Sequence, residues 1–259
     1  MKNLNSNRDF FIFNQLVNKN LAGENDKPLK FSSREIFLLD NAVKSQRKII
    51  TILDHNLKKY LYVSDNIEEV IGLTHQSLIL NGYYYFVNHI LHPEDVNMIR
   101  ATINVAREFV DNSFTEYEKA NMTYVYSMRI KNSYNQDVQL LYKSQIHEIK
   151  KDHLIELGFT SNVSHWKKSK YHYAFIKSAI KNLLLYAEPE SYKVEEIHFT
   201  KAQLNVLTQL AQGKSVNEVA KALYLSKHTI ETHRKHMLSK TKFNDTNELI
   251  NFALEAGLV

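Results

Sequence analysis

Cysteine is absent from the 259 residues of this chain, and glycine and proline are scarce, at six and three residues. Without thiols there is no disulfide scaffold, thiolate zinc site, cysteine nucleophile or cysteinyl-flavin photochemistry. Six glycines leave little material for backbone loops that cradle phosphate groups. The chain also lacks a nucleophile elbow and a His/Asp cluster with metal-ligand spacing. We therefore expect a protein that is not an enzyme, with no catalytic residue and no metal site.

Long hydrophobic runs are missing as well. The apolar stretch 10–13 near the N-terminus is interrupted by Asn14 and Gln15, so it is too short for a signal-peptide core or a membrane span. A hydrophobic share of 44% and a charged share of 24% are ordinary for a globular protein that buries a core. These features predict a cytoplasmic protein without a membrane segment.

Residues 47–166 contain recurring short runs rich in β-branched and aromatic residues, which is typical of strands. Helical material lies between the second and third of these runs. Two strands, short helices and three further strands predict an α+β domain with an antiparallel sheet. The expected strands are 49–53, 60–63, 123–130, 138–148 and 154–160.

The segments on either side of this domain favour helices. Residues 1–46 form an expected helical segment, in which Ser32 or Ser33 caps a helix. Residues 167–197 form an expected helical linker, with one helix over 166–187 that ends before Pro189. This helix carries a heptad seam, which indicates either a dimer contact or packing within the chain. The seam residues are Tyr173, Ile176, Ile180, Leu183 and Ala187.

Residues 198–259 predict four helices with unusually clear end signals. A Ser, Thr or Asp precedes each helix, and in three cases a Gln or Glu follows three residues later, as in a capping box. Gly213 and Gly257 end the first and last helices, where glycine tolerates the left-handed backbone. The expected capping residues are Thr200, Ser215, Ser226 and Asp245.

The third of these helices has two distinct faces. Ile230, Met237 and Leu238 form its apolar side. The opposite side is a stripe of polar groups that can donate and accept hydrogen bonds, namely His228, Glu231, Thr232 and Lys235. A helix pair joined by a tight turn, with such a stripe on its second helix, suits insertion into the major groove of DNA.

Positive charge is concentrated around the same helix pair. The whole chain has a net charge of 33 − 28 = +5, whereas residues 213–242 alone carry 7 − 2 = +5, because Glu218 and Glu231 are their only acids. Such local charge favours phosphate contacts whose strength falls with salt. The alternative is a solvated basic face on a small helical bundle. The basic residues are Lys214, Lys221, Lys227, Arg234, Lys235, Lys240 and Lys242.

These residues resemble the LuxR-type helix-turn-helix over about sixty positions. The family pattern is a Thr start, Val-Leu, a Gly turn, Glu-[Ile/Val]-Ala-x-x-Leu, Ser-x-x-Thr-[Ile/Val]-x-x-His, a Lys and a closing Ala-x-x-x-Gly-Leu. The chain departs from it at 202–203, 216–217 and 241–242. It matches at Thr200, Val206, Leu207, Gly213, Ser215, Glu218, Val219, Ala220, Leu223, Ser226, Thr229, Ile230, His233, Lys240 and residues 253–258.

The resemblance implies specific roles for the side chains of the third helix. Lys227, Thr229 and Lys240 match positions that hold phosphates, and His233 matches a structural position between helices. Glu231, Thr232 and Lys235 match positions that face base edges, where Lys can donate to guanine and Glu can accept from cytosine. The predicted site for double-stranded DNA consists of these phosphate-holding and base-facing residues together with His228 and Arg234, and it does not include His233. The last helix, 246–256, matches the segment where related domains dimerise, so we expect a homodimer.

Residues 47–166 resemble a PAS domain. The resemblance depends on 61–72, on 90–95 with Pro93 at the first helical position, and on the closing segment 158–164. PAS domains bind small molecules or partner proteins between sheet and helices. Candidate lining residues, which could equally be plain core, are Phe86, His89, Tyr124, Tyr126 and Met128. The cofactor stays unknown, since the twelve histidines leave haem open but none stands in a distinctive context.

The expected architecture is thus an α+β PAS-like domain, a helical linker and an all-α LuxR-type domain at 198–259. No receiver-type acid pair opens the chain, so phosphorylation of an acceptor Asp is not expected. The leading hypothesis is a one-component transcription regulator whose PAS-like domain senses a small molecule or a partner and whose C-terminal domain binds the major groove as a dimer. The alternative is that the PAS-like domain only docks a partner protein such as a sensor kinase.

Overall fold

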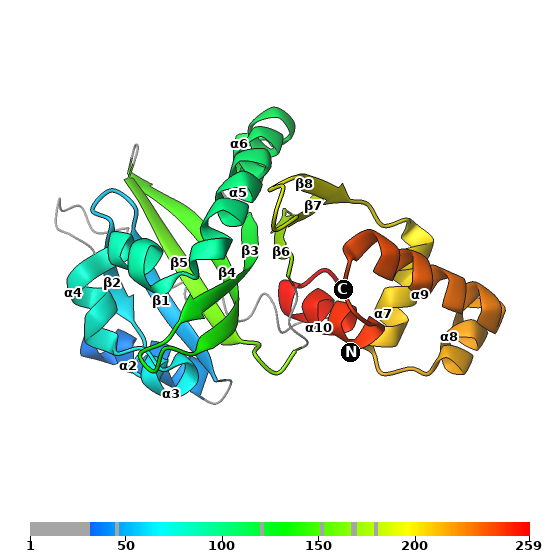
Figure 1. Cartoon of the computed structure of the whole chain (residues 1–259), viewed down its shortest axis with the longest axis horizontal. Coiled ribbons are helices and arrows are strands. Elements are labelled where there is room, and N and C mark those ends of the chain that lie inside the picture. The colour runs from blue at the N-terminus through cyan, green and yellow to red at the C-terminus, as the bar shows by residue number, and fades with distance from the viewer. Residues whose placement is uncertain (1–31, 45–46, 120–121, 151–152, 167–169, 179–180) are drawn as a thin grey trace.

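One antiparallel sheet runs through most of the chain and four helices pack against its far end (Figure 1). The computed structural model describes residues 32–259 except 45–46, 120–121, 151–152, 167–169 and 179–180. Most of the expected helical segment 1–46 therefore lies outside the described residues. The sheet has eight strands in the order β2-β1-β5-β4-β3-β6-β7-β8.

The first five strands are those expected from the sequence. β1 (Lys48–Asp54) pairs with β2 (Lys59–Val63) and with β5 (His153–Asn162). β4 (Asp137–Lys150) lies between β5 and β3 (Thr123–Lys131). All these pairs are antiparallel, so the predicted α+β arrangement with an antiparallel sheet is confirmed in this part of the chain.

Helices between β2 and β3 cover one face of this sheet. They are α3 (Ile67–Ile71), α4 (His75–Tyr85), the π-helical turn η1 (Phe86–Ile90), α5 (Pro93–Ser113) and the short α6 (Glu116–Lys119). α2 (Ser33–Lys44) precedes β1 and confirms the helix expected there. Among the described residues, no helix combines the length and the apolar character needed to cross a bilayer.

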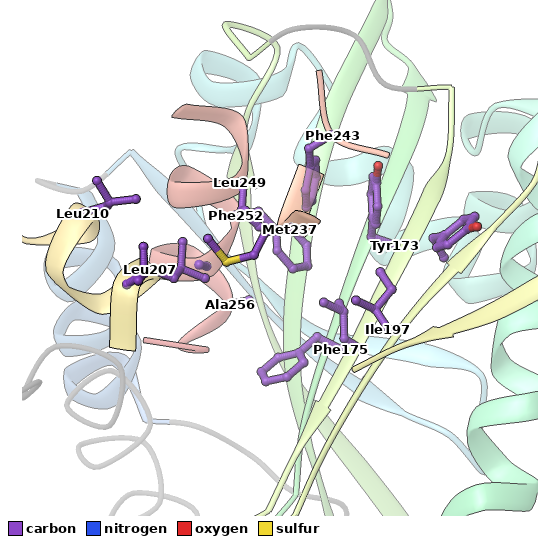
Figure 2. Close-up of a cluster of buried hydrophobic side chains, with 14 of the residues drawn as sticks. Tyr173, Phe175, Ile197, Leu207, Leu210, Met237, Phe243, Leu249, Phe252 and Ala256 are labelled. Carbon is purple, nitrogen blue, oxygen red and sulfur yellow. The ribbon is translucent and has the colours of Figure 1, made fainter. Parts of the chain in front are cut away.

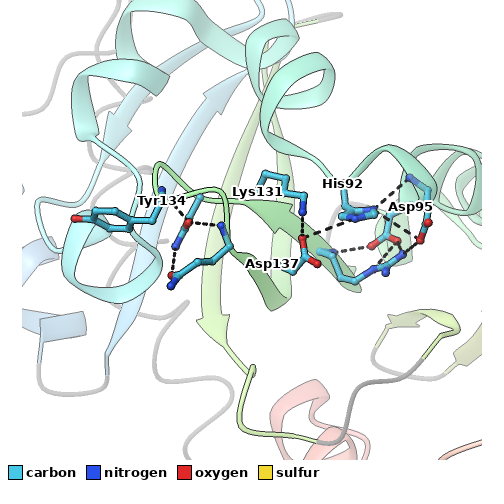
Figure 3. Close-up of polar contacts among 9 residues, drawn as sticks. His92, Asp95, Lys131, Tyr134 and Asp137 are labelled. Carbon is cyan, nitrogen blue, oxygen red and sulfur yellow. Dashed lines mark hydrogen bonds and ion pairs between the residues drawn. The ribbon is translucent and has the colours of Figure 1, made fainter.

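A polar network fixes the start of α5 against β3 (Figure 3). His92 caps the helix and Pro93 occupies its first turn, as predicted. The buried Asp95 accepts hydrogen bonds from the backbone N–H of Arg129 at 2.7 Å and from its Nε at 2.9 Å. Because Asp95 is buried, these charge-assisted bonds hold α5 in one orientation over the sheet.

The predicted helical linker is wrong, because this segment forms strands. β6 (His172–Lys177), β7 (Asn182–Ala187) and β8 (Val194–Ile197) extend the sheet beyond β3. The junction is the pairing of β3 with β6, in which Tyr124 faces Ile176 and Tyr126 faces Ala174.

The heptad spacing led to a wrong prediction of a helix because the apolar residues of β6 and β7 form nearly continuous runs. A continuous run contains residues at every spacing, and periodicity then cannot separate a helix from a doubly buried strand. Ala174 and Ile176 pack toward α5 on one face, whereas Tyr173 and Phe175 belong to a core on the opposite face. Both faces of β6 are therefore buried, as the run of apolar residues requires.

The four predicted C-terminal helices are confirmed as α7 (Lys201–Ala211), α8 (Val216–Leu223), α9 (Lys227–Thr241) and α10 (Thr246–Ala256). All four expected caps accept a hydrogen bond from the backbone N–H three residues later. Gly257 adopts the left-handed backbone at the end of α10, and Gly213 does so after α7, with φ of 71° and 80°.

The second face of the sheet extension and the C-terminal helices share one hydrophobic core (Figure 2). Tyr173 is its centre, with its ring stacked on Phe243 at 4.3 Å between centroids and 5.7 Å from Phe252. Its hydroxyl donates to the carbonyl oxygen of Thr241, the last residue of α9, at 3.0 Å. The C-terminal helices are therefore packed on the sheet rather than tethered to it.

Replacing Tyr173 tests this shared core. Tyr173→Ala removes a fully buried ring, so we expect the free energy of unfolding to fall by about 3–5 kcal/mol. We also expect urea unfolding to split into two transitions, monitored by tryptophan fluorescence and circular dichroism. The control Tyr173→Phe keeps the ring and should cost about 1 kcal/mol in a single transition. One transition in Tyr173→Ala would argue against this role.

His172, beside Tyr173, provides a pH test of the same region. Its ring nitrogens have no hydrogen-bond partner among the described residues, and burial lowers its pKa to about 4. The unfolded chain takes up this proton near pH 6.5, whereas the folded chain does not. Stability should therefore fall as the pH drops from 6.5 toward 4.

We expect this histidine to account for about 2 kcal/mol of stability lost between pH 7 and pH 4.5, from the difference between the two pKa values. Urea unfolding at both pH values, compared with His172→Gln, measures the contribution. The variant should lose correspondingly less over the same interval. Equal losses in the two proteins would contradict the buried, neutral imidazole.

Candidate nucleic-acid interface and ligand cavity

The turn between α8 and α9 positions the candidate recognition helix. Tyr224 ends α8 in the left-handed backbone, with φ of 56°, and the N–H of Leu225 donates to the carbonyl oxygen of Ala220 at 2.9 Å. Ser226 then caps α9 by accepting from the N–H of Thr229 at 3.0 Å. These local bonds set the angle at which α9 leaves the turn.

All eight predicted DNA-binding residues lie on α9, but some have exposed side chains and others are held by hydrogen bonds within the domain. Ile230 and Met237 are fully buried and anchor the inner side. Lys227, His228 and Lys235 are exposed on the outer side. Because these three side chains are exposed and lie on one helix, they are the side chains best placed to contact an anionic surface.

Arg234 and Glu231 form a connection that the sequence did not predict. Arg234 Nη1 contacts both carboxylate oxygens of Glu231, at 2.8 and 3.0 Å. Its Nε and Nη2 donate to Thr246 Oγ1, at 3.2 and 3.0 Å, in the first turn of α10. In this arrangement Arg234 ties α9 to α10 and orients the Glu231 carboxylate, whose oxygens keep further lone pairs as acceptors.

Two other predicted residues are also held locally. Lys240 Nζ donates to the carbonyl oxygen of His198 at 2.8 Å and to Gln203 Oε1 at 3.2 Å, which ties the end of α9 to the start of α7. Thr232 Oγ1 donates to the carbonyl oxygen of His228 at 2.9 Å. His233 is half-buried, in keeping with the structural role expected for it.

Tyr224 is an exposed residue of this surface that sequence reasoning missed. It is 96% exposed at the tip of the turn, beside the N-terminus of α9. The sequence signal for this turn residue was the lack of a glycine after α8. Tyr224 therefore adopts the left-handed backbone itself, at a conformational cost.

A cavity of about 400 Å³ lies in the PAS-like domain between the sheet and the helices α3 to α5. Its volume is in the range of small-molecule sites in proteins. Among the predicted lining residues, Phe86, Tyr126 and Met128 do line it. Tyr124 instead borders a neighbouring hollow, which Tyr126 also lines.

His89 was wrongly predicted to line this cavity. It is exposed on η1 and packs its ring against Tyr85, with centroids 5.2 Å apart. The π-helical turn changes which side chains face inward, so Phe86 and Val87 reach the cavity and His89 does not. No group of three or more His, Asp or Glu among the described residues could hold a metal ion.

One end of the cavity is polar and was not foreseen. Glu156 on β5 is only 7% exposed, and its Oε2 lies 2.8 Å from His55 Nε2. Burial, together with the charge of Glu156, raises the pKa of Tyr60, Tyr83 and Tyr126, which line the same cavity. These phenols therefore stay protonated and can donate hydrogen bonds near a carboxylate.

Gly158 makes room for another tyrosine of this cavity. A Cβ on Gly158 would collide with the hydroxyl and ring carbons of Tyr142, so the phenol ring lies directly over the glycine. Thr51 on β1 and Ser144 on β4 face Gly158 in the sheet register. Both hydroxyls are buried without a hydrogen-bond partner among the described residues.

An inward-facing acid on β5 was recognisable in principle, because Glu156, Gly158 and Thr160 alternate with apolar residues along one strand. The alternation showed that they share a face, but not that this face is the one covered by helices. Only the placement of α3 to α5 decides that question.

The comparisons with known proteins concern mainly the C-terminal helices. Residues 198–253 match the family described as bacterial regulatory proteins, luxR family, so the four helices are a LuxR-type helix-turn-helix domain. The transcriptional regulatory protein YhcZ of Bacillus subtilis is 35% identical over 71 residues, which are 27% of this chain and 32% of that protein. YxjL from the same organism is 36% identical over 61 residues, 24% of this chain and 28% of that protein. The chain spans about a third of the length of these relatives.

Two solved structures that match this chain do so with low sequence identity and low TM-scores. The N-terminal domain of a diguanylate cyclase with PAS/PAC sensor from Marinobacter aquaeolei is 13% identical, with a TM-score of 0.35 over 46% of this chain and 96% of that one. VqmA from Vibrio cholera, in a complex with ligand and DNA, is 15% identical, with a TM-score of 0.33 over 89% of this chain and 90% of that one.

Gly158→Ala tests the packing of the cavity wall. The new methyl group collides with the ring of Tyr142, which must move, so the free energy of unfolding should fall by about 1–3 kcal/mol. Adding Tyr142→Leu removes the colliding ring, so the double variant should lose less than the sum of the two single variants. Urea unfolding of all three proteins measures this, and simple additivity would rule out the predicted collision.

Proposed function

We propose that this protein is a DNA-binding transcription regulator whose α9 enters the major groove. The observation that carries the proposal is a LuxR-type helix-turn-helix domain with the cations Lys227 and Lys235 exposed on the outer side of α9. Lys227 and Thr229 bind phosphates, and Lys235 and Thr232 contact base edges. Glu231, oriented by Arg234, contributes to base recognition as a hydrogen-bond acceptor.

The PAS-like domain acts as the sensor, so that one chain both detects a small molecule and binds DNA. The cavity beside Tyr126 supports this role, because β3, which carries Tyr126, pairs directly with β6 of the shared core. A ligand that favours one position of β3 can therefore bias the position of the DNA-binding helices. Two such chains bind a symmetric operator as a homodimer.

A second candidate function is protein docking without a small ligand. Leu80 and Tyr84 on α4 are 77% and 62% exposed, which leaves two large apolar side chains on the outer side of the PAS-like domain. Native mass spectrometry of the purified chain distinguishes the two functions. A copurifying small molecule supports sensing, and an empty chain that captures a sensor kinase supports docking.

DNA binding is tested with Lys235→Glu in a mobility-shift assay with genomic fragments over a salt series. Reversing one charge at the groove should weaken binding by about tenfold or more and reduce the salt dependence. The matched control is Lys59→Glu, the same charge change at an exposed position of β2.

The control should bind as the wild type does. Absence of binding by the wild-type chain would refute the proposed function. Undiminished binding by Lys235→Glu would refute the assignment of α9 as the recognition helix.

A further inference from the structure

The cavity of the PAS-like domain combines charges of both signs. Glu156 is the single carboxylate of its lining within the described residues, while Lys58 and Arg107 contribute two permanent positive charges. Neither cation forms an ion pair with another described residue. A cavity wall that offers one acceptor and two unpaired donors suits a ligand that carries both charges.

The carboxylate of Glu156 is only half satisfied. Its Oε2 contacts His55, whereas Oε1 accepts no hydrogen bond from the described residues. Tyr60, Tyr83 and Tyr126 line the cavity around it. A buried carboxylate oxygen among aromatic rings is a favourable place for an ammonium group, which it can pair with while the ring faces attract the cation.

The opposite end of the cavity is apolar. Glu156 faces Leu53 across β1 and β5, whereas Ile49, four residues away along β1, faces Thr160. Four residues of strand correspond to about 13 Å. Around Ile49 the wall consists of buried aliphatic side chains such as Ile67, Ile71 and Leu78. The cavity thus runs from a charged end to a hydrocarbon end.

We propose that this cavity binds an amino acid with an apolar side chain. The ammonium group pairs with Glu156 Oε1, the carboxylate group is held by Lys58 and Arg107, and the side chain extends toward Ile49 and Ile67. The hydroxyls of Thr51 and Tyr142 are available for the remaining polar atoms of the ligand. This inference depends on the proposed sensor role and specifies the chemical class of its ligand.

The experiment uses the purified full chain and isothermal titration calorimetry with leucine, methionine and phenylalanine. Each amino acid is compared with one analogue that lacks the carboxylate and one that lacks the ammonium. For phenylalanine these analogues are phenethylamine and 3-phenylpropanoate, respectively. We expect at least one amino acid to bind, and either deletion to weaken binding by about 10- to 100-fold, because each removes a charge-assisted hydrogen bond. An acid analogue that binds as tightly as its amino acid would overturn the ammonium site.

Variants locate the two charges. Glu156→Gln should weaken binding of the amino acid by about tenfold or more, yet leave the affinity for the acid analogue unchanged. Lys58→Met should weaken binding of the amino acid and of the acid analogue, and leave the affinity for the amine analogue unchanged. The matched controls are Glu116→Gln on α6 and Lys59→Met, the exposed neighbour of Lys58. Equal losses of affinity in the site and control variants would overturn the assignment of the two charges. If Glu156→Gln does not fold, the affinities of the wild-type protein for the analogues test the ammonium site instead.

A mobility shift with the same preparations separates this inference from the proposed function. Loss of DNA binding in the wild type refutes the regulator. Normal DNA binding with no affinity for any of the three amino acids refutes the ligand class alone. A copurifying molecule of another class, found by native mass spectrometry, also refutes the ligand class and leaves small-molecule sensing intact.

Discussion

The pairing of β3 with β6 is the contact on which the rest of the structure depends. It lengthens a five-stranded sheet into one of eight strands and brings a continuous apolar segment between two layers of helices. On one face Ala174 and Ile176 pack toward α5, and on the other Tyr173 and Phe175 pack toward the C-terminal helices. Without this pairing the two ends of the chain would have no common core.

Local chemistry explains which parts of the fold were predictable. The caps at Thr200, Ser215, Ser226 and Asp245 act through bonds within three residues, so the C-terminal helices could be placed from the sequence alone. Strands β1 to β5 were likewise recognisable from β-branched and aromatic runs. The strands β6 to β8 were not, because an apolar segment that is buried on both faces has no alternation to read.

In the candidate sites too, features set by local sequence were predictable and features set by tertiary contacts were not. The positions of Lys227 and Lys235 follow from the helix period, so their common outer side was predictable. The bridge from Arg234 to Thr246 joins two helices, and Glu156 lines one cavity with Tyr60 and Tyr126 only because separate strands lie side by side in the sheet. Contacts of this kind depend on tertiary structure, which no local pattern contains. His89 shows the reverse case, where a single π-helical turn moved a locally plausible residue to the surface.

The shared core around Tyr173 has a consequence for how this protein could be divided or recombined. The luxR family match begins at residue 198, which is the natural place to cut when fusing such a domain to another sensor. A cut there would strip Phe243 and Phe252 of their partner ring and expose an aromatic surface to water. The exchangeable unit is therefore larger than the helix-turn-helix and includes the strands β6 to β8. When sensors are exchanged between regulators of this architecture, the junction should therefore lie between β5 and β6, because each new sensor must supply a strand edge for β6 to join.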